Sequence, residues 1–461
     1  MSNNSCVCNS VAVHCAERPG SMTETGALTS RIEVTLPVAP EARQSASRTA
    51  LAALIGNVLE WFDFAVYGYF ASDIGKQFFP QSSPGAQHLL AFGVFAVGFG
   101  ARPIGSLVLG AFGDRLGRRA LMVLSIALMG VATLSIGLLP NSDTLGAAAP
   151  LMLVILRLIQ GFSLGGEFTG SMVYTTELAA APARGLVSSF AAVGTTIGFI
   201  IGSATAWLVH SSLNADQVTS WGWRIPFLGS VVWVLAGWAL RRGLHETPAG
   251  LQAAATRPAL IASVAADWLP MLQTFGIAAM TNAAYYLVFT YAVERRTRVT
   301  DAGSAFLLAN TLSLFAVLFA KPLGGWLSDR IGRRRLMLLL TIITMALMVP
   351  ALWLMLYGPL WAFGIGQILL AVPLGMALGL QGAMLVEIFP LRTRVTSMSF
   401  AYSVTLAAAG GTAPLVSSWL VERLGQPLAP AWYIMLYGVL GLIVMVSMKE
   451  TNTRALDEVV A

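Results

Sequence analysis

The chain has 461 residues, of which 56% are hydrophobic and only 11% are charged, and its formal net charge is +6. Soluble domains average roughly 25% charged residues, so this composition excludes an ordinary globular enzyme and indicates a membrane protein. In a membrane protein, the positive charge is better explained by lysine and arginine in the loops than by nucleic-acid binding.

The first 48 residues carry few large apolar side chains, and we expect residues 1–48 to form a disordered cytoplasmic tail. They contain no apolar run long enough for a signal peptide, and Met22 is an alternative start to Met1. All cysteines of the chain lie in this tail: Cys6, Cys8 and Cys15. Their spacing is not that of a structural zinc site, so we predict reduced thiols and no bound metal.

Long apolar runs fill the rest of the chain, and a helix needs about 20 apolar residues to cross a bilayer. The predicted spans lie at 50–72, 88–111, 120–139, 149–175, 186–209, 224–241, 268–293, 303–326, 335–356, 360–388, 396–421 and 430–448. The predicted fold is therefore an all-α membrane protein with twelve transmembrane helices in two six-helix bundles. The bundles cover residues 49–242 and 267–448, a polar linker covers 243–266, and a cytoplasmic C-terminal tail covers 449–461.

The loops predict which side of the membrane is cytoplasmic. With twelve spans both termini lie on one side, and the loops of that side carry most of the lysine and arginine residues. This excess predicts that both termini are cytoplasmic. Arg295, Arg296 and Arg298 are an exception on the opposite side. They form either a solvated loop or a basic funnel that attracts anionic solutes from outside.

Span one carries polar side chains at spacings of three and four, which place them on one stripe of a helix. The stripe contains Asn57, Glu60, Asp63 and Tyr67. An acid cannot face lipid, so the stripe must face water or a partner cation, for which Arg157 of span four is a natural candidate. A buried ion pair is a weak source of stability, so we favour proton coupling by Asp63, with Glu60 second, over a purely structural pair. The predicted proton-coupling residues are Asp63, Glu60, Arg157 and Glu167.

Each half also has a cation that precedes a proline within a span, namely Arg102 in span two and Lys321 in span eight. Arg102 lies 12 residues before Asp114, and Lys321 lies 8 residues before Asp329, the equivalent aspartate of the second half. The two offsets differ by about one helical turn, so the two cations share roughly one helical face. A cation in each half, near an opened helix, either binds a carboxylate-bearing solute between the halves or pairs with a neighbouring acid. The predicted substrate-binding residues are Asn57, Tyr67, Arg102, Gln160, Tyr285, Tyr286, Lys321 and Gln381, and further aromatic candidates are Tyr174, Tyr291 and Tyr402.

A charged loop occurs once in each half. The stretch Gly110-Ala-Phe-Gly-Asp114-Arg115-Leu-Gly117-Arg118-Arg119 recurs as Gly325-Trp-Leu-Ser-Asp329-Arg330-Ile-Gly332-Arg333-Arg334. An internal repeat at the half-chain distance in a membrane protein indicates a transporter built from two halves. More acids and arginines follow spans four and ten, and we predict that these charges together form a cytoplasmic gate. The predicted gate residues are Asp114, Arg115, Arg118, Glu177, Arg184, Asp329, Arg333, Glu387 and Arg394.

The motifs of common enzymes are missing from the sequence. It contains no His-Glu-x-x-His, no Gly-x-Ser-x-Gly and no phosphate-binding Gly-x-x-x-x-Gly-Lys-Ser/Thr. We therefore expect neither an enzyme nor an ATP-driven pump, and no cofactor.

The doubled Gly-x-x-x-Asp-Arg-x-Gly-Arg-Arg loop resembles the signature of the major facilitator superfamily. More narrowly, four stretches resemble the metabolite:proton symporters: Gly56-Asn-Val-Leu-Glu60-Trp-Phe-Asp63-Phe, Arg102-Pro-Ile-Gly, Arg157-Leu-Ile-Gln-Gly-Phe-Ser-Leu-Gly-Gly-Glu167 and Trp221-Gly-Trp-Arg-Ile-Pro-Phe. The resemblance covers about residues 48–448 and implies proton-driven uptake across a bacterial inner membrane. In related sugar carriers a span-one acid pairs with a span-four arginine, which corresponds here to Asp63 and Arg157.

The resembling group includes carriers for citrate, 2-oxoglutarate, shikimate and proline or betaine, so the resemblance leaves several substrates open. The tail after Lys449 is short and lacks the long heptad coil of some osmosensing proline/betaine carriers. We therefore expect a monomeric symporter of protons with a small organic acid such as citrate or 2-oxoglutarate. The alternative is a symporter of proline or glycine betaine, and an efflux antiporter is less expected.

Overall fold

The computed structural model describes residues 56–116, 118–242, 266–300, 302–391, 393–452 and 456, without the side chains of 110–122 and 240–242. All of these residues belong to one compact unit, residues 44–461. The described part does not include the predicted N-terminal tail or nearly all of the linker. It also lacks the side chains of three predicted gate residues. Those three residues are Asp114, Arg115 and Arg118.

The first half of the chain provides helices at each predicted span. Span one is helical over 56–69. The remaining helices of this half are α2 (Ala71–Phe78), α3 (Pro84–Gly100), α4 (Arg102–Leu116), α5 (Arg118–Leu138), α6 (Ser142–Leu145), α7 (Ala148–Ser163), α8 (Glu167–Leu178), η1 (Ala181–Ala183), α9 (Arg184–Ser212), α10 (Ala215–Gln217), η2 (Val218–Gly222), α11 (Arg224–Gly229) and α12 (Val231–Arg242).

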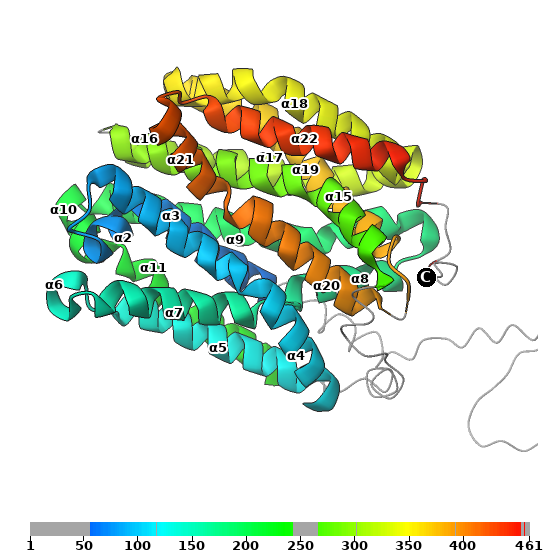
Figure 1. Ribbon diagram of the computed structural model, residues 1–461, viewed down its shortest axis with the longest axis horizontal. Coiled ribbons are helices and arrows are strands. Elements are labelled where there is room, and N and C mark those ends of the chain that lie inside the picture. Colours follow the sequence, from blue (N-terminus) through cyan, green and yellow to red (C-terminus); the bar gives the residue numbers. More distant parts are fainter. Residues whose placement is uncertain are drawn as a thin grey trace, which may run out of the picture. The chain divides into compact units, whose positions relative to one another are not determined.

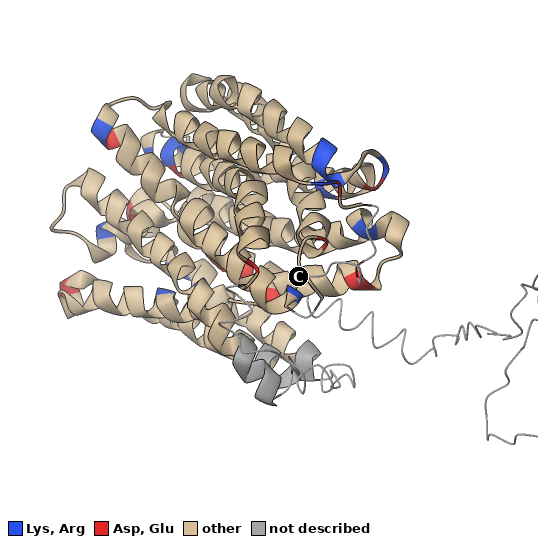
Figure 2. Cartoon of the chain, turned by 45° about the vertical axis from the view of Figure 1, so that its right-hand side comes forward, with Lys and Arg blue, Asp and Glu red and all other residues tan. Residues whose placement is uncertain are grey.

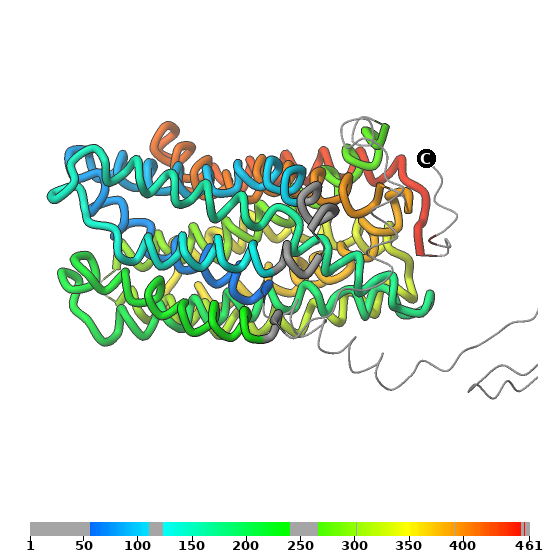
Figure 3. Tube along the Cα trace, turned by 90° about the horizontal axis from the view of Figure 1, so that it is seen from below, coloured from blue at the N-terminus to red at the C-terminus, as the bar shows by residue number. Residues whose placement is uncertain are grey.

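The second half repeats the arrangement with longer uninterrupted helices. They are α15 (Trp268–Tyr286), the π-helix η3 (Leu287–Tyr291), α16 (Ala292–Val299), α17 (Gly303–Ile331), α18 (Arg333–Tyr357), α19 (Leu360–Val386), α20 (Arg394–Thr405), the π-helix η4 (Leu406–Gly411), α21 (Ala413–Leu424) and α22 (Ala429–Ser447). Figure 1 shows the long helices running side by side, with α5 and α7 along one edge and α18 and α22 along the opposite edge. Figure 3, turned by 90°, shows the same common direction.

Several helix ends follow directly from local sequence. At the start of α3, Pro84 occupies the first turn, where its missing N–H costs nothing, and the Ser83 side chain accepts a hydrogen bond from the Ala86 N–H at 3.4 Å. Asn214 and Gln217 form a reciprocal capping box on α10. At the other end of a span, α21 stops at Gly425, whose φ of 65° is a left-handed conformation that glycine adopts readily.

The surface of the bundle is that of a protein in lipid. Large apolar side chains project outward from the long helices, including Phe319 (72% exposed), Trp361 (69%) and Ile443 (65%). Charged residues gather mostly toward the ends of the helices (Figure 2). Eight described helices are long and apolar enough to cross a membrane, and shorter apolar helices occupy spans three and six. The predicted all-α architecture is confirmed.

Glycines allow the helices of the first half to approach closely. A Cβ placed on Gly161 of α7 would lie 1.6 Å from the Gly98 carbonyl oxygen of α3, and one on Gly165 would lie 2.0 Å from the Ser106 nitrogen of α4. Small residues four apart permit such backbone contact in membrane bundles. This contact fixes span four, which carries Arg157, against span two, which carries Arg102.

Of the two cation-proline pairs, Arg102-Pro103 and Lys321-Pro322, only the first coincides with a break in its helix. Span two breaks at Ala101, so that Arg102 starts α4 and is followed by Pro103. In contrast, α17 runs without interruption through Lys321 and Pro322. The expectation of an opened helix at both cations is therefore wrong for span eight, where the proline is accommodated inside the helix.

Candidate functional site

A central cavity lies between helices of the two halves. Its lining residues are Trp61, Phe168, Met172, Ala192, Thr195, Asn282, Tyr285, Lys321, Leu378, Gln381 and Tyr402. Its volume is about 20 Å³, which is room for a water molecule and much less than a metabolite needs. Three predicted substrate-binding residues, Tyr285, Lys321 and Gln381, meet in this cavity, as does the further aromatic candidate Tyr402.

Lys321 is the cation of this cavity. Its Nζ atom donates hydrogen bonds to the Ala192 carbonyl oxygen at 2.6 Å and to Thr195 Oγ1 at 2.7 Å, both on α9 of the other half. Among the described residues, no carboxylate forms an ion pair with it. Burying an ammonium group with only neutral partners is costly.

Two further polar side chains in the cavity lack partners. The indole Nε1 of Trp61 and both amide atoms of Gln381 form no hydrogen bond with any described residue, although both side chains are buried. Most buried polar groups in native proteins are satisfied, so each such group requires an explanation. Both groups line the cavity.

Aromatic rings form another part of the cavity wall. The rings of Trp61 and Phe168 lie 5.6 Å apart between centroids, and those of Phe168 and Tyr402 lie 5.7 Å apart. The Tyr402 hydroxyl donates to Asn282 Oδ1 at 3.3 Å, which orients its ring. The wall therefore offers π faces as well as hydrogen-bond donors, and such faces attract apolar or cationic groups.

A second buried cluster surrounds Asp63, which is 2% exposed. The predicted ion pair is confirmed, because Arg157 Nη1 lies 3.3 Å from Asp63 Oδ2. Gln160 Nε2 donates to the same carboxylate oxygen at 2.6 Å and to Thr133 Oγ1 at 2.7 Å, while its Oε1 accepts from Arg157 at 2.9 Å. The Arg157 guanidinium also lies over the Tyr67 ring at 4.1 Å. A proton added to Asp63 would weaken several of these contacts at once; its role in coupling stays a prediction.

Arg102 forms an ion pair with an acid in this structure. Its Nη2 lies 2.6 Å from Glu60 Oε1, and both side chains are buried. The guanidinium also lies 5.7 Å from the centre of the Phe99 ring. Of the two predicted alternatives for Arg102, the structure has the pair with a neighbouring acid, and Arg102 does not line the described cavity.

The other predicted substrate and coupling residues lie outside the described cavity. Asn57 donates to Ser171 Oγ and the Ala191 carbonyl oxygen, and the Tyr67 hydroxyl donates to the Ala91 carbonyl oxygen. Tyr286 packs in an aromatic cluster, Gln160 belongs to the Asp63 cluster, and Glu167 lies in the first turn of α8. Residues that sequence reasoning missed are Trp61, Phe168, Met172, Ala192, Thr195, Asn282 and Leu378. Trp61 adjoins Glu60 in a quoted motif, which was the one available signal.

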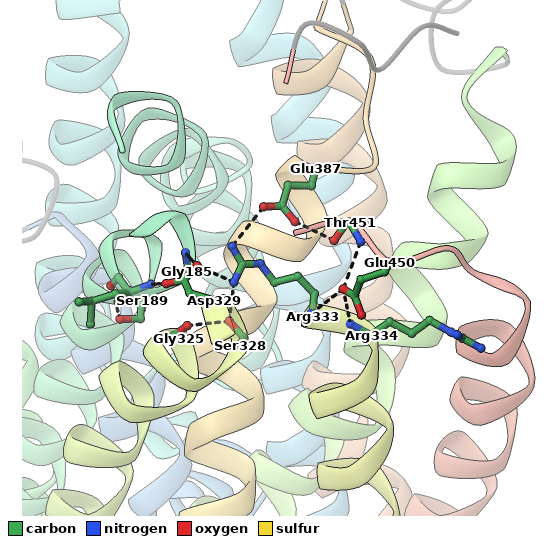
Figure 4. A network of polar contacts seen from close by, with 11 residues as sticks. Gly185, Ser189, Gly325, Ser328, Asp329, Arg333, Arg334, Glu387, Glu450 and Thr451 are labelled. Carbon is green, nitrogen blue, oxygen red and sulfur yellow. Dashed lines mark hydrogen bonds and ion pairs between the residues drawn. The ribbon is translucent and has the colours of Figure 1, made fainter. Parts of the chain in front are cut away.

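One end of the bundle is closed by a charged network centred on the second copy of the repeated loop (Figure 4). Asp329 accepts hydrogen bonds from the backbone N–H groups of Gly185 at 2.8 Å and Leu186 at 2.9 Å, which belong to the first turn of α9 in the other half. A carboxylate at a helix N-terminus is favourable because the exposed N–H groups carry partial positive charge. Arg333 then bridges Asp329 at 2.7 Å and Glu387 at 3.3 Å.

A second contact joins the halves at the same end, where Arg394 Nη1 lies 2.9 Å from Glu177 Oε1. Arg184, another predicted gate residue, begins α9 and is 8% exposed. The backbones also touch there, since a Cβ on Gly185 would lie 2.4 Å from the Gly325 carbonyl oxygen. The structure thus brings Glu177, Asp329, Arg333, Glu387 and Arg394 together, while their function as a gate remains a prediction.

The beginning of the predicted C-terminal tail is part of this network, which the sequence did not indicate. Glu450 Oε1 accepts hydrogen bonds from the backbone N–H groups of Arg333 at 2.6 Å and Arg334 at 3.1 Å, at the start of α18. Thr451 Oγ1 donates to Glu387 Oε2 at 2.7 Å. The Leu456 carbonyl oxygen accepts from Arg394 at 2.8 Å. The segment is therefore bound to the bundle rather than a free tail over these residues.

Toward the opposite end of the bundle, neutral hydrogen bonds also join the halves. Asn310 Nδ2 of α17 donates to Tyr69 Oη and Ser203 Oγ of the first half, each at 2.9 Å. Thr311 Oγ1 donates to Ser203 Oγ at 2.8 Å. With contacts between the halves at both ends and a contracted cavity between them, the structure is in a closed arrangement.

Replacing Asp329 by asparagine is expected to open the charged end. The change weakens the two charge-assisted hydrogen bonds that join Asp329 to the first half, a loss of about 1.5–3 kcal/mol, or roughly 10- to 150-fold in the closed-to-open ratio. Spin labels at the exposed residues Leu178 and Leu391, after removal of the three cysteines, report this opening as a longer electron-spin distance. Arg330→Gln is the matched control, because exposed Arg330 stacks on Trp326 outside the network. An unchanged distance distribution in D329N removes the gate assignment.

Comparisons with known proteins agree with this architecture. The family model described as "Sugar (and other) transporter" matches residues 49–258, and the model described as "Major Facilitator Superfamily" matches residues 298–455. A proline/betaine transporter of Escherichia coli (strain K12) is 34% identical over 88% of this chain and 84% of its own length. A citrate-proton symporter of Klebsiella pneumoniae is 34% identical over 93% of this chain and 98% of its own length.

The fold is also similar to a solved transporter. The structure of the proton:xylose symporter XylE bound to 6-bromo-6-deoxy-D-glucose matches with a TM-score of 0.72 at 19% identity, and covers 90% of this chain and 98% of that chain. At that identity the match concerns the arrangement of the helices alone. It agrees with the predicted division into two six-helix bundles.

Proposed function

Because the chain is a proton-coupled transporter of the major facilitator superfamily, we propose that it carries a small carboxylate-bearing solute together with protons into a bacterial cell. Transport would proceed by alternating opening of the two ends of the bundle, in a monomer of the inner membrane with both termini in the cytoplasm. Its family and its relatives are transporters.

One observation carries this proposal: Lys321 lies in the central cavity with neutral partners only among the described residues. A carboxylate would displace the Ala192 carbonyl and Thr195 hydroxyl oxygens from its ammonium group and gain charge-assisted hydrogen bonds. The Trp61 indole and the Gln381 amide would supply further donors. Because Lys321 now bonds across the halves, binding would also release a contact that holds the cavity closed.

The cavity supports a solute with a single carboxylate. It presents one cation, while three neighbouring rings, those of Trp61, Phe168 and Tyr402, form an apolar wall that also attracts positive charge. Of the two predicted substrate classes, these features favour proline or glycine betaine. The organic acids citrate and 2-oxoglutarate remain the second candidates, supported by Arg102, which would provide another cation if protonation of Glu60 released it.

Protons would be carried by the Asp63 cluster. The carboxylate is buried and held by Arg157 and Gln160, and it lies on the same helix as the cavity residue Trp61. Protonation would free Arg157 from its partner and allow the first half to rearrange. The pair Glu60–Arg102 is the alternative proton site.

Uptake into proteoliposomes tests the proposal. With an inward proton gradient, labelled glycine betaine or proline is expected to accumulate, and an uncoupler is expected to reduce the internal concentration to the external one. Protein-free liposomes are the control. Accumulation of citrate or 2-oxoglutarate with no betaine competition would establish the second candidate. Uptake of every solute that is insensitive to the uncoupler would contradict proton coupling.

A further inference from the structure

A second cavity lies at the end of the bundle opposite to the charged network. Its volume is about 220 Å³, and its lining residues are Gly85, His88, Tyr291, Arg295, Arg298, Ser418, Val421 and Glu422. They come from α3 in the first half and from η3, α16 and α21 in the second. Helix α17 separates the two ends, because its 29 residues begin just after α16 and end just before Arg333, a rise of about 43 Å. We refer to this cavity as the outer pocket.

One wall of the outer pocket is basic. Arg295 and Arg298, three residues apart on α16, face it together. Arg295 Nη1 donates to Tyr291 Oη at 3.3 Å, and Arg298 Nε lies 3.7 Å from Glu294 Oε1. Neither contact uses the full set of guanidinium donors, since each arginine has five N–H groups. Both cations can therefore take a further anionic partner.

A buried histidine faces the same space. His88 is 6% exposed, and its Nε2 lies 3.2 Å from Glu294 Oε2 across the interface of the halves. Its Nδ1 has no hydrogen-bond partner among the described residues. Glu294 is itself only 2% exposed, lies near both His88 and Arg298, and does not line the pocket.

Glu422 provides a carboxylate on another part of the lining. Glu422 of α21 is exposed and forms no ion pair with any residue in the described part of the chain. Its position depends on the absence of a side chain in α3, because a Cβ on Gly85 would lie 1.8 Å from Glu422 Oε1. The outer pocket thus has arginines on one side and an uncommitted acid on the other, with the ring of Tyr291 also in its lining.

We propose that the outer pocket is an external binding site for a small zwitterion. Its carboxylate would contact Arg295 and Arg298, and its ammonium group would contact Glu422. A polyanion would be repelled by Glu422, and a simple cation would be repelled by the two arginines. The volume is enough for several water molecules and hence for a small solute. Since the walls belong to both halves, a bound zwitterion would be held where the outer end must open.

Binding to full-length protein in lipid nanodiscs tests this site apart from the central cavity. The background variant is Lys321→Ala, which removes the proposed central cation. Saturation-transfer NMR is then recorded with glycine betaine, and with acetate and choline, which each carry one of its two charged ends. We expect glycine betaine to bind K321A, and to bind it more tightly than acetate or choline does. In K321A/R295Q and in K321A/E422Q the affinity for betaine should fall about tenfold.

Arg423→Gln supplies the matched control, because exposed Arg423 neighbours Glu422 on α21 but does not line the outer pocket. In K321A/R423Q the betaine signal is expected to equal that of K321A. Loss of the signal in K321A alone, no effect of R295Q and E422Q, or equal binding of acetate would each overturn the proposal. The site does not depend on the proposed transport function: if betaine binds here but proteoliposomes show no proton-driven uptake, only the transport proposal fails.

Discussion

Replacing Asp63 by asparagine is expected to abolish proton-driven accumulation while leaving exchange of solute between the two sides. Asparagine keeps the size of the side chain and an oxygen that accepts the hydrogen bond from Gln160, now 2.6 Å long, so the fold around Arg157 is retained. It cannot exchange a proton. The internal-to-external ratio of labelled solute in proteoliposomes should therefore fall to one under an inward proton gradient, whereas counterflow should stay within a few-fold of the wild-type rate.

The matched variant is Glu60→Gln, because Glu60 lies one turn away on the same helix and pairs with the other buried arginine, Arg102. If Asp63 is the coupling acid, E60Q should still accumulate solute and its counterflow should remain dependent on pH, while counterflow by D63N should not. Full accumulation by D63N would refute the role of Asp63. Loss of coupling in E60Q alone would move the proton site to the Glu60–Arg102 pair.

Contacts between charged groups inside the spans could be predicted from the sequence. A charge exposed to lipid is so costly that each one must find either an oppositely charged partner or water. Asp63 cannot face lipid, and Arg157 in span four was a suitable partner; the structure has that pair. The same reasoning left two alternatives for Arg102, since a nearby acid and a bound solute satisfy a cation equally well. The structure contains the pair with Glu60.

The lining of the cavity could not be predicted in the same way. Phe168 and Asn282 carry no charge, and their place beside Lys321 depends on how α8 and α15 approach α17 across the two halves. The spacing of residues within one helix does not predict how that helix packs against the others. Glu450 was missed for a related reason: its hydrogen bonds go to the backbone at the start of α18, and any short acidic segment after the last span would appear equally free from sequence alone.

The two ends of the bundle are joined by different contacts. At the charged end, Asp329 of the second half accepts hydrogen bonds from the Gly185 and Leu186 N–H groups of the first half, and Arg394 pairs with Glu177. Toward the other end, Asn310 donates to Ser203, and His88 lies 3.2 Å from Glu294 across the same interface. Both sets of contacts must separate when the halves move apart at that end.

Replacing Lys321 by alanine is expected to remove most of the affinity for solute. The change eliminates the charge-assisted hydrogen bonds proposed for the carboxylate, worth about 1.5–3 kcal/mol, so the dissociation constant should rise roughly 10- to 150-fold. Lys321→Arg keeps the charge and should retain more of the affinity. Binding of labelled glycine betaine to the protein in nanodiscs measures both variants, with R295Q present in each so that the outer pocket does not contribute.

Loss of affinity alone would not identify the carboxylate as the partner, because Lys321 also bonds to Ala192 and Thr195 and thereby affects the closed state. Comparing glycine betaine with choline, which has the same quaternary ammonium but no carboxylate, separates the two effects. In R295Q, which keeps Lys321, the carboxylate should improve binding; in K321A/R295Q the two ligands should bind alike. If K321A weakens both ligands equally, Lys321 acts on the closure of the cavity, and the carboxylate must be held by another group, for which Arg102 is the other predicted substrate-binding cation.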